Sequence, residues 1–365
     1  MNSKRENPQF LKEQIITYLG NKRSLLEFLN KGFDYAKNEL RKDKFSFCDI
    51  FSGSGVVSRF VKPCASFIVA NDLEDYSRII NECYLSNQNP QFLQELQKYY
   101  TFLLADLKLE KGFISKLYAP NDDKNIQKNE RVFYTLKNAM YLDSIRKKIA
   151  TLPNDMQKYF IAPLIYEASV HANTSGVFKG FYKDKNGIGK FGGNAGHALS
   201  RIKGDIALKM PIFSNFTCEF EVFQKDANVL AKELDGIEVV YLDPPYNQHP
   251  YGSNYFMLNL IANYKKPKEL SKVSGIPQDW NRSAFNKEKT AEDALFGLIN
   301  DLKAKIVLLS YNCEGFVKKE NFLKRLKKIG KCEILEQKYN TFRASRNLSK
   351  RSIHIQEQLY VIKKY

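Results

Sequence analysis

The stretch Glu238–Tyr246, with the sequence EVVYLDPPY, constrains the fold of this chain more than any other. Its apolar, β-branched beginning has the length of a buried strand. The two prolines cannot continue a β-ladder, so the strand must end there, with Asp243 and Tyr246 held on a stiff turn. Ligands of open α/β sheets bind at this end of the strands. A fixed acceptor beside a fixed ring suits a flat substrate with an amine, such as a nucleobase, although a plain surface turn is the alternative.

An alternation of strand, helix and strand earlier in the chain predicts a parallel α/β sheet. Residues 45–51 have the pattern of a strand that runs directly into the glycine motif at 52–55, and a helix is expected over 56–61. A second strand is expected over 66–70, closed by Asp72. This alternation is typical of parallel strands joined by helical crossovers.

The pattern is interrupted after the second strand and resumes later in the chain. Between residues 77 and 216 the sequence favours helices and loops, with helical spacing at 130–149 and 155–170. Two more helices are expected, from Ser24 to Leu40 and over 253–264. The remaining strands are expected at 218–223, 238–242, 305–309, 332–337 and 358–362. Seven strands in this arrangement predict one α/β domain interrupted by a large insertion.

An excess of 17 positive charges, from 57 Lys and Arg against 40 Asp and Glu, predicts a polyanionic partner. Nucleic acid is the simplest candidate, and an anionic membrane surface is the alternative. No apolar run approaches the roughly 18 residues that span a bilayer, and the polar residues 1–14 predict no signal peptide. Six scattered cysteines and four isolated histidines predict reduced thiols in a cytoplasmic protein and no metal site.

The glycine motif and the acid that follows it predict a ligand site at the same edge of the sheet. Gly53 and Gly55 allow the backbone to approach a ligand closely, as in dinucleotide sites, although the third glycine of a pyrophosphate fingerprint is missing. Asp72 stands about 20 residues further on, where an acid accepts both hydroxyls of a ribose. A generic tight turn and a helix-capping Asp72 are the alternatives.

Together these motifs resemble those of the S-adenosylmethionine-dependent DNA adenine N6-methyltransferases. The resemblance rests on Asp49–Gly55, DIFSGSG, and on YLDPPY at 241–246, and Ile50 departs from it where proline is usual. The sequence YLGNK at 18–22 looks like the N-terminal cofactor motif of the same family. The N-terminal motif comes first, the glycine motif second and YLDPPY last, with the insertion between the last two. This order is typical of the alpha group, to which the Dam-type enzymes (D12 class) belong.

The resemblance implies a seven-stranded class I (Rossmann-like) methyltransferase sheet with an inserted, mostly helical and loop target-recognition domain. The catalytic domain would comprise residues 1–76 and 217–365, and the recognition domain residues 77–216. The stretches 173–180 and 339–343 also resemble members that accompany restriction enzymes. The implied contacts to S-adenosylmethionine are Tyr18, Lys22, Asp49, Phe51, Gly53, Gly55, Asp72 and Asp226.

The same resemblance implies that Asp243 and the carbonyl of Pro244 accept hydrogen bonds from the target amine, while Tyr246, beyond Pro245, stacks on the base. The chemistry fits without the family, because two fixed acceptors expose the lone pair of a poorly nucleophilic adenine amine. A carboxylate in a dry site also stabilises the positive charge that develops on that amine. A base in a duplex must flip out to reach such a site. For His249, a general-base role and a purely hydrogen-bonding role both remain open.

Cations and aromatic residues alternate in the insertion and predict DNA contacts. Cations position the phosphates, and glycines let the backbone come close, although a solvated basic loop is the alternative. Arginines in the polar loop near the end of the chain suit phosphates better than the helical basic runs do. The predicted DNA-binding residues are Lys179, Lys183, Lys185, Lys190, Arg201, Arg343 and Arg346.

The sequence thus predicts a cytoplasmic, monomeric enzyme that methylates adenine N6 in a specific duplex DNA site, as the modification part of a restriction-modification system with a cognate endonuclease. Two rivals remain. An enzyme of the same fold could act on cytosine N4 or on RNA adenine, and a module without catalysis could only bind DNA. The intact Asp243 and Tyr246 argue against the second rival.

Overall fold

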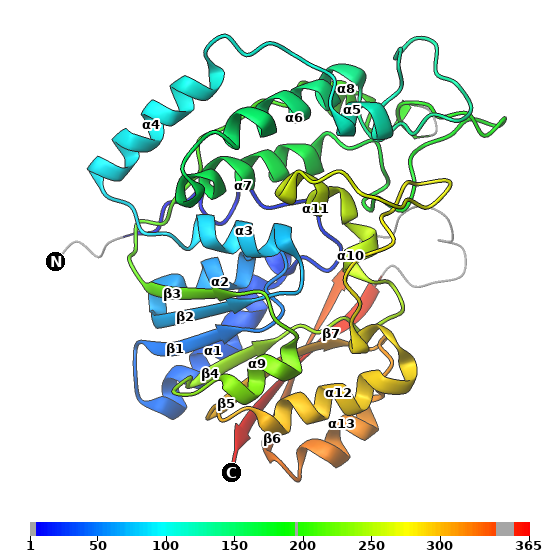
Figure 1. Ribbon diagram of the computed structural model, residues 1–365. Coiled ribbons are helices and arrows are strands. Elements are labelled where there is room, and N and C mark those ends of the chain that lie inside the picture. Colours follow the sequence, from blue (N-terminus) through cyan, green and yellow to red (C-terminus); the bar gives the residue numbers. More distant parts are fainter. Residues whose placement is uncertain (1–4, 194–195, 341–353) are drawn as a thin grey trace.

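The computed structural model describes residues 5–193, 196–340 and 354–365, which contain a mixed seven-stranded sheet (Figure 1). The strands are β1 (Phe45–Asp49), β2 (Ala65–Asn71), β3 (Glu219–Phe223), β4 (Val239–Leu242), β5 (Ile306–Asn312), β6 (Gly330–Asn340) and β7 (His354–Lys364). Their order across the sheet is β3-β2-β1-β4-β5-β7-β6. The first five pair in parallel, and β7 is antiparallel to both of its neighbours. The Rossmann-like α/β sheet predicted from the sequence is therefore confirmed.

Helices cover both faces of this sheet, and the alternation of apolar side chains along each strand explains why. In β4, Val239 and Tyr241 belong to the core on one face, whereas Val240 and Leu242 belong to the core on the other. All four side chains are buried, as expected for a strand with both faces covered. The covering helices are α1 (Leu26–Leu40) and α2 (Val56–Val61) on the first face, and α9 (Ala227–Glu233), α12 (Glu288–Asp301) and α13 (Lys319–Leu326) on the second.

A helical layer stands beside the sheet (Figure 1) and contains an apolar core of its own, in addition to the two on the faces of the sheet. In this layer Arg146 donates to the carbonyls of Ile261 and Ala262 at 2.7 and 3.0 Å, so the insertion is joined to a helix from the C-terminal part of the chain. None of the described helices is long and apolar enough to cross a membrane. The layer comprises α3 (Asp75–Tyr84), α4 (Pro90–Leu104), α5 (Phe113–Tyr118), α6 (Leu136–Ile149), α7 (Asn154–Val170), α8 (Leu199–Lys203) and α11 (Phe256–Asn263). The division into domains at residues 76 and 216 stays a prediction.

Two helices differ from the sequence-based expectation. The helix expected over 130–149 begins only at Leu136, because the Thr135 hydroxyl accepts from the Asn138 amide and caps it. The helix expected over 253–264 is divided into α10 (Tyr251–Asn254) and α11, since Tyr255 has φ −122° and ψ 24° and leaves the helical region. A short 3-10 helix, η1 (Lys22–Leu25), precedes α1.

Candidate active site

Three strand ends place acidic side chains at one edge of the sheet. β1 ends at Asp49, β2 is followed by Asp72, and β4 is followed by Asp243. Because β1 pairs in parallel with both β2 and β4, these ends lie together. Burial raises the pKa of Asp49 to about 7, and the pKa values of Asp72 and Asp243 to about 6. Converging acids with displaced pKa values are typical of functional sites.

The turn after β1 requires glycine at two positions. Gly53 has φ +50° and Gly55 has φ +73°, which L side chains rarely adopt. A β-carbon on Gly53 would also stand 3.1 Å from the ring of Tyr18. The Gly53 amide donates to Asp72 Oδ2 at 2.8 Å, and the Glu74 amide donates to Asp72 Oδ1 at 3.0 Å. The turn therefore fixes both the aromatic ring and the carboxylate beside it.

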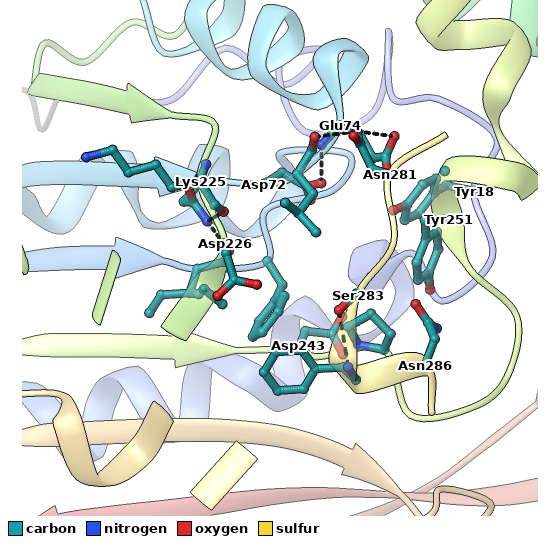
Figure 2. A pocket seen from close by; sticks show the side chains of 18 residues that line it. Tyr18, Asp72, Glu74, Lys225, Asp226, Asp243, Tyr251, Asn281, Ser283 and Asn286 are labelled. Atoms are coloured by element: carbon teal, nitrogen blue, oxygen red, sulfur yellow. Dashed lines mark hydrogen bonds between the residues drawn. The ribbon is translucent and has the colours of Figure 1, made fainter. Parts of the chain in front are cut away.

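An acidic pocket opens in front of these strand ends (Figure 2). Two of its aromatic side chains, Phe51 and Phe285, meet edge to face with ring centroids 5.1 Å apart. Carboxylates on an aromatic cleft suit a ligand that has hydroxyl groups, an amine and a flat ring. The side chains that give the pocket its character are Tyr18, Phe51, Asp72, Glu74, Asp226, Asp243, Tyr251, Asn281, Ser283, Phe285 and Asn286.

Glu74 is a pocket residue that the sequence analysis missed. Its carboxylate is buried, and its Oε2 accepts from the side-chain amides of Asn259 at 2.5 Å and Asn281 at 3.3 Å. Burial raises the pKa of Glu74 to about 8. Asn281 donates in addition to the Leu73 carbonyl at 2.7 Å. The available sequence signal for Glu74 was its place two residues after Asp72, whereas nothing in the sequence marks Asn281.

Asp226 lines the acidic pocket and also begins a helix. Its Oδ1 accepts from the amides of Asn228 at 2.9 Å and Val229 at 3.3 Å, which caps α9. This capping fixes the side chain at the pocket wall, where Figure 2 shows it opposite Asp72 and Glu74.

A smaller cavity continues the acidic pocket toward the glycine turn. It is lined by Lys22, Asp49, Gly53 and Asp243, among others, so it gathers further residues implied by the resemblance. Oδ2 of Asp49 accepts from the Ser58 hydroxyl at 2.9 Å, whereas its buried Oδ1 has no hydrogen-bond partner within the described part of the chain. A buried acceptor without a partner, on a residue that lines a cavity, suits the ammonium group of a ligand.

The loop Asp243–Tyr246 carries the remaining predicted site residues. Asp243 Oδ1 pairs with the ammonium of Lys22 at 2.9 Å. The Tyr246 carbonyl accepts from the Phe316 amide at 3.1 Å, and the Tyr246 ring meets Tyr311 edge-on at 6.0 Å. The loop is thus held from both sides, and Lys22, implied as a cofactor residue, contacts the acid of this loop.

A second, outer pocket lies on the other side of this loop. Tyr18 and Tyr251 line both pockets, and their rings stack with centroids 4.8 Å apart. The Tyr251 hydroxyl donates to the Leu19 carbonyl at 3.1 Å, so α10 braces the N-terminal motif. The outer pocket is lined by Tyr246, Asn247, His249, Asn254, Asn312, Glu314 and Glu357, by Gly176 of the insertion and by residues around Lys22.

The predicted DNA-binding cations occupy different settings. Lys179, Lys183 and Lys185 are exposed, and Lys183 lies in a small hairpin closed by a bridge to Gly189. Arg201, in contrast, turns inward, and its guanidinium donates to backbone carbonyls that include that of Ala172 at 3.2 Å. Lys190 is partly buried. The predicted contacts Arg343 and Arg346 lie outside the described residues.

A sheet with this strand order, a glycine turn after its first strand and Asp-Pro-Pro-Tyr at its carboxyl edge defines an α/β methyltransferase. The substrate class follows from comparison with protein families. The model of the D12 class N6 adenine-specific DNA methyltransferases matches residues 18–278, and the chain belongs to this family. The family assignment made from the motifs is confirmed, and adenine in DNA is the substrate of the family.

Several curated proteins are similar over most of this chain. Type II methyltransferase M.NlaIII of Neisseria lactamica is 28% identical over 359 residues, covering 96% of this chain and 99% of the relative. Type II methyltransferase M.CviAII of Paramecium bursaria Chlorella virus 1 is 27% identical, and the match covers 90% of this chain and 93% of that relative. Type II methyltransferase M.FokI of Planomicrobium okeanokoites is 26% identical, with 95% of this chain matching 52% of that longer relative.

Proposed function

We propose that this protein transfers a methyl group from S-adenosylmethionine to N6 of an adenine in a specific duplex DNA sequence. The observation that carries the proposal is the loop in which Asp243 lines the acidic pocket and Tyr246 lines the outer pocket. The prolines between them hold the acceptor and the ring in a fixed relation. A methyl donor in one pocket and a flat base in the other would meet at Asp243.

The residues of the acidic pocket and the smaller cavity fit S-adenosylmethionine. Asp72 suits the ribose hydroxyls and Asp226 the adenine amine, because both are fixed acceptors on the pocket wall. The unpartnered Oδ1 of Asp49 suits the ammonium of the methionine portion, next to Phe51 and the glycine turn. When bound, this cofactor supplies an activated methyl group on a sulfonium sulfur.

Asp243 and the Pro244 carbonyl act on the target amine. By accepting from its two hydrogens they direct the nitrogen lone pair toward the methyl group. As the N–C bond forms and the S–C bond breaks, the Asp243 carboxylate stabilises the positive charge that builds on the nitrogen. One amine hydrogen then leaves as a proton to water. The step needs no covalent bond to the enzyme.

The outer pocket is the proposed place of the flipped adenine. Extrusion of a base costs a few kcal/mol, and stacking on Tyr246 returns about 1–3 kcal/mol. Gly176 brings the insertion to the rim of this pocket, and the exposed lysines 179, 183 and 185 follow it in the chain. We assign these lysines to the phosphates of the duplex.

The relatives support a role in restriction and modification. M.NlaIII and M.CviAII bear the name of type II methyltransferases and match this chain over nearly its whole length. We infer that the protein is a monomeric modification enzyme that protects DNA from a cognate endonuclease. Mapping of methylated adenines in host DNA tests the site specificity, and resistance of the methylated DNA to the endonuclease tests the pairing.

Incubation with labelled S-adenosylmethionine and duplex DNA, followed by digestion to nucleosides, tests the proposal directly. Label is expected in N6-methyl-2′-deoxyadenosine. Asp243→Ala is expected to slow methylation by about 10²–10³-fold while cofactor and DNA still bind. Asp235→Ala, which removes an exposed acid just before the same strand, is the matched control and should keep full activity. Label in N4-methylcytosine or only in RNA, or full activity of Asp243→Ala, would contradict the proposal.

A further inference from the structure

Lys22 lies between two carboxylates from different parts of the fold. Its ammonium is 2.9 Å from Asp243 Oδ1 and 3.5 Å from Glu357 Oε1, and it donates to the Gly20 carbonyl at 3.3 Å. The side chains of Lys22 and Glu357 are only 7% and 5% exposed. A cation at this depth requires partners that remain in place, because an unpaired buried charge is strongly unfavourable.

Glu357 is placed for a role in the site and not merely in the core. It is in β7, and its Oε1 accepts from the Ser310 hydroxyl in β5 at 2.7 Å. The antiparallel register of the two strands sets Glu357 directly opposite Asn312. Both residues line the outer pocket together with Lys22 and Tyr246. The strand pair therefore fixes a second carboxylate beside the place proposed for the target base.

The charges of this group decide whether the site can favour the reaction. Methyl transfer builds positive charge on the amine, and Asp243 alone with Lys22 would form a pair with no net charge. Glu357 gives the three groups a net charge of −1 and provides a second partner for the ammonium. Oδ2 of Asp243 is then left for the amine while Lys22 holds Oδ1.

We propose that Glu357 is a positioning residue for the methyl transfer, acting through Lys22 to hold the Asp243 carboxylate in place and to keep the site negative. This inference rests on the proposed function. It adds to the Asp-Pro-Pro-Tyr loop a residue more than 100 positions away in the chain, which no motif of the sequence marks.

The pH dependence of the rate separates this role from a merely structural one. The groups that face Asp243 are Lys22 from η1, Asp49 from β1, Tyr241 from β4, Tyr246 from its own loop, Tyr251 from α10 and Glu357 from β7. Burial raises the pKa of Asp243, the positive charge of Lys22 lowers it, and the negative charge of Glu357 raises it further. Since Asp243 must be ionised to act, activity should fall as the pH drops through about 6.

The experiment is the pH profile of kcat/KM for three variants of the full chain with duplex DNA. Glu357→Gln should lower kcat on the order of tenfold, as for other groups that orient a reacting residue. It should also move the acid limb of the profile, the fall of kcat/KM at low pH, to lower pH. Its KM for S-adenosylmethionine should stay within roughly a factor of two. Lys22→Met should move the acid limb to higher pH, whereas Glu357→Asp, which keeps the charge, should leave it near that of the wild type.

Glu336→Gln is the matched control. Glu336 lies outside both pockets in β6, the strand next to β7, and its carboxylate also pairs with a lysine, Lys319 of α13. It should change neither kcat nor the acid limb. Unchanged kcat and acid limb in Glu357→Gln would overturn the inference. If Glu357→Gln does not fold, the test rests on Lys22→Met. The inference is overturned if the fall of kcat/KM at low pH does not move to higher pH in that variant. A wild-type protein that does not methylate DNA adenine would refute the proposed function, which is a different outcome.

Discussion

At Gly53 the backbone conformation and the proposed cofactor site depend on the same missing side chain. Gly53→Ala places a β-carbon at φ +50°, and this β-carbon would stand 3.1 Å from the Tyr18 ring. The left-handed conformation should cost about 1–2 kcal/mol of folding free energy. Displacement of Tyr18 should in addition weaken binding of S-adenosylmethionine, measured by titration calorimetry.

The control for this prediction is Gly236→Ala. Gly236 also has a positive φ, +70°, but a β-carbon there would meet no atom within 4 Å. It precedes β4, at the edge of the sheet away from the pockets. Its unfolding free energy should fall by a similar amount while its affinity for the cofactor is retained. Equal losses of affinity in both variants would show that the Gly53 effect is one of stability alone.

Asp226 caps α9 and is proposed to bind the cofactor, and two substitutions distinguish these roles. Asp226→Ala removes the cap of α9 and should lower the free energy of unfolding by about 0.5–2 kcal/mol, measured by urea denaturation. Asp226→Asn keeps a good capping residue but removes the negative charge. If Asp226 binds the adenine amine of the cofactor, both variants should bind S-adenosylmethionine less tightly, and only the alanine variant should be less stable. Wild-type affinity in the asparagine variant would assign Asp226 to capping alone.

At the scale of elements, the segment 281–286 connects the acidic pocket to the end of the Asp243–Tyr246 loop (Figure 2). Asn281 donates to the Leu73 carbonyl at 2.7 Å near Glu74, and Asn286 donates to the Asn247 carbonyl at 2.9 Å just after the Asp-Pro-Pro-Tyr motif. The two ends of the segment therefore hold different parts of the site.

Substitutions at the two ends of this segment should have different effects. Asn281→Ala loses hydrogen bonds worth about 0.5–1.5 kcal/mol, so we expect roughly two- to tenfold weaker binding of S-adenosylmethionine. Asn286→Ala should chiefly lower kcat, because it frees Asn247 at the end of the loop that is proposed to be catalytic. Cofactor titration and steady-state kinetics measure the two effects. The same profile in both variants would mean that the segment acts as one unit.

Element prediction succeeded where local pattern determines structure. The apolar run of β4 ends at two prolines, so its boundary could be placed from the sequence, and helix α2 was found over 56–61 as expected. The predicted start of α6, at residue 130, was wrong. The helical spacing begins before Thr135, but the side chain of Thr135 caps the helix, which therefore begins at Leu136. The break in the helix at Tyr255 could not be foreseen, since the sequence across it has uninterrupted apolar spacing. The Tyr255 hydroxyl accepts from the amide of Leu19, which is distant in the chain.

For the whole molecule, the net charge of +17 predicts binding to DNA that weakens steeply with salt. Each lysine that neutralises a phosphate contributes about −0.9 to the slope of log K against log salt concentration. Lys183→Ala should therefore make the slope less steep by about 1, measured by fluorescence anisotropy with duplex DNA. Lys303→Ala removes an exposed lysine that pairs with Asp235 near the start of β5, and should leave the slope unchanged. Equal changes in both variants would place the DNA elsewhere.

The sequence by itself determined the seven strands, the glycine motif, the Asp-Pro-Pro-Tyr motif and the family. It could do so because the signals of glycine, proline and apolar periodicity act over a few residues. It also determined that Asp49, Asp72 and Asp243 lie at one edge, since parallel strands present their carboxyl ends together. Only the tertiary structure decided that Lys22 contacts Asp243, that Glu357 shares that ammonium, and that Glu74 and Asn281 complete the acidic pocket. These contacts join residues far apart in the chain, and their partners follow from how strands and loops pack, which no local pattern contains.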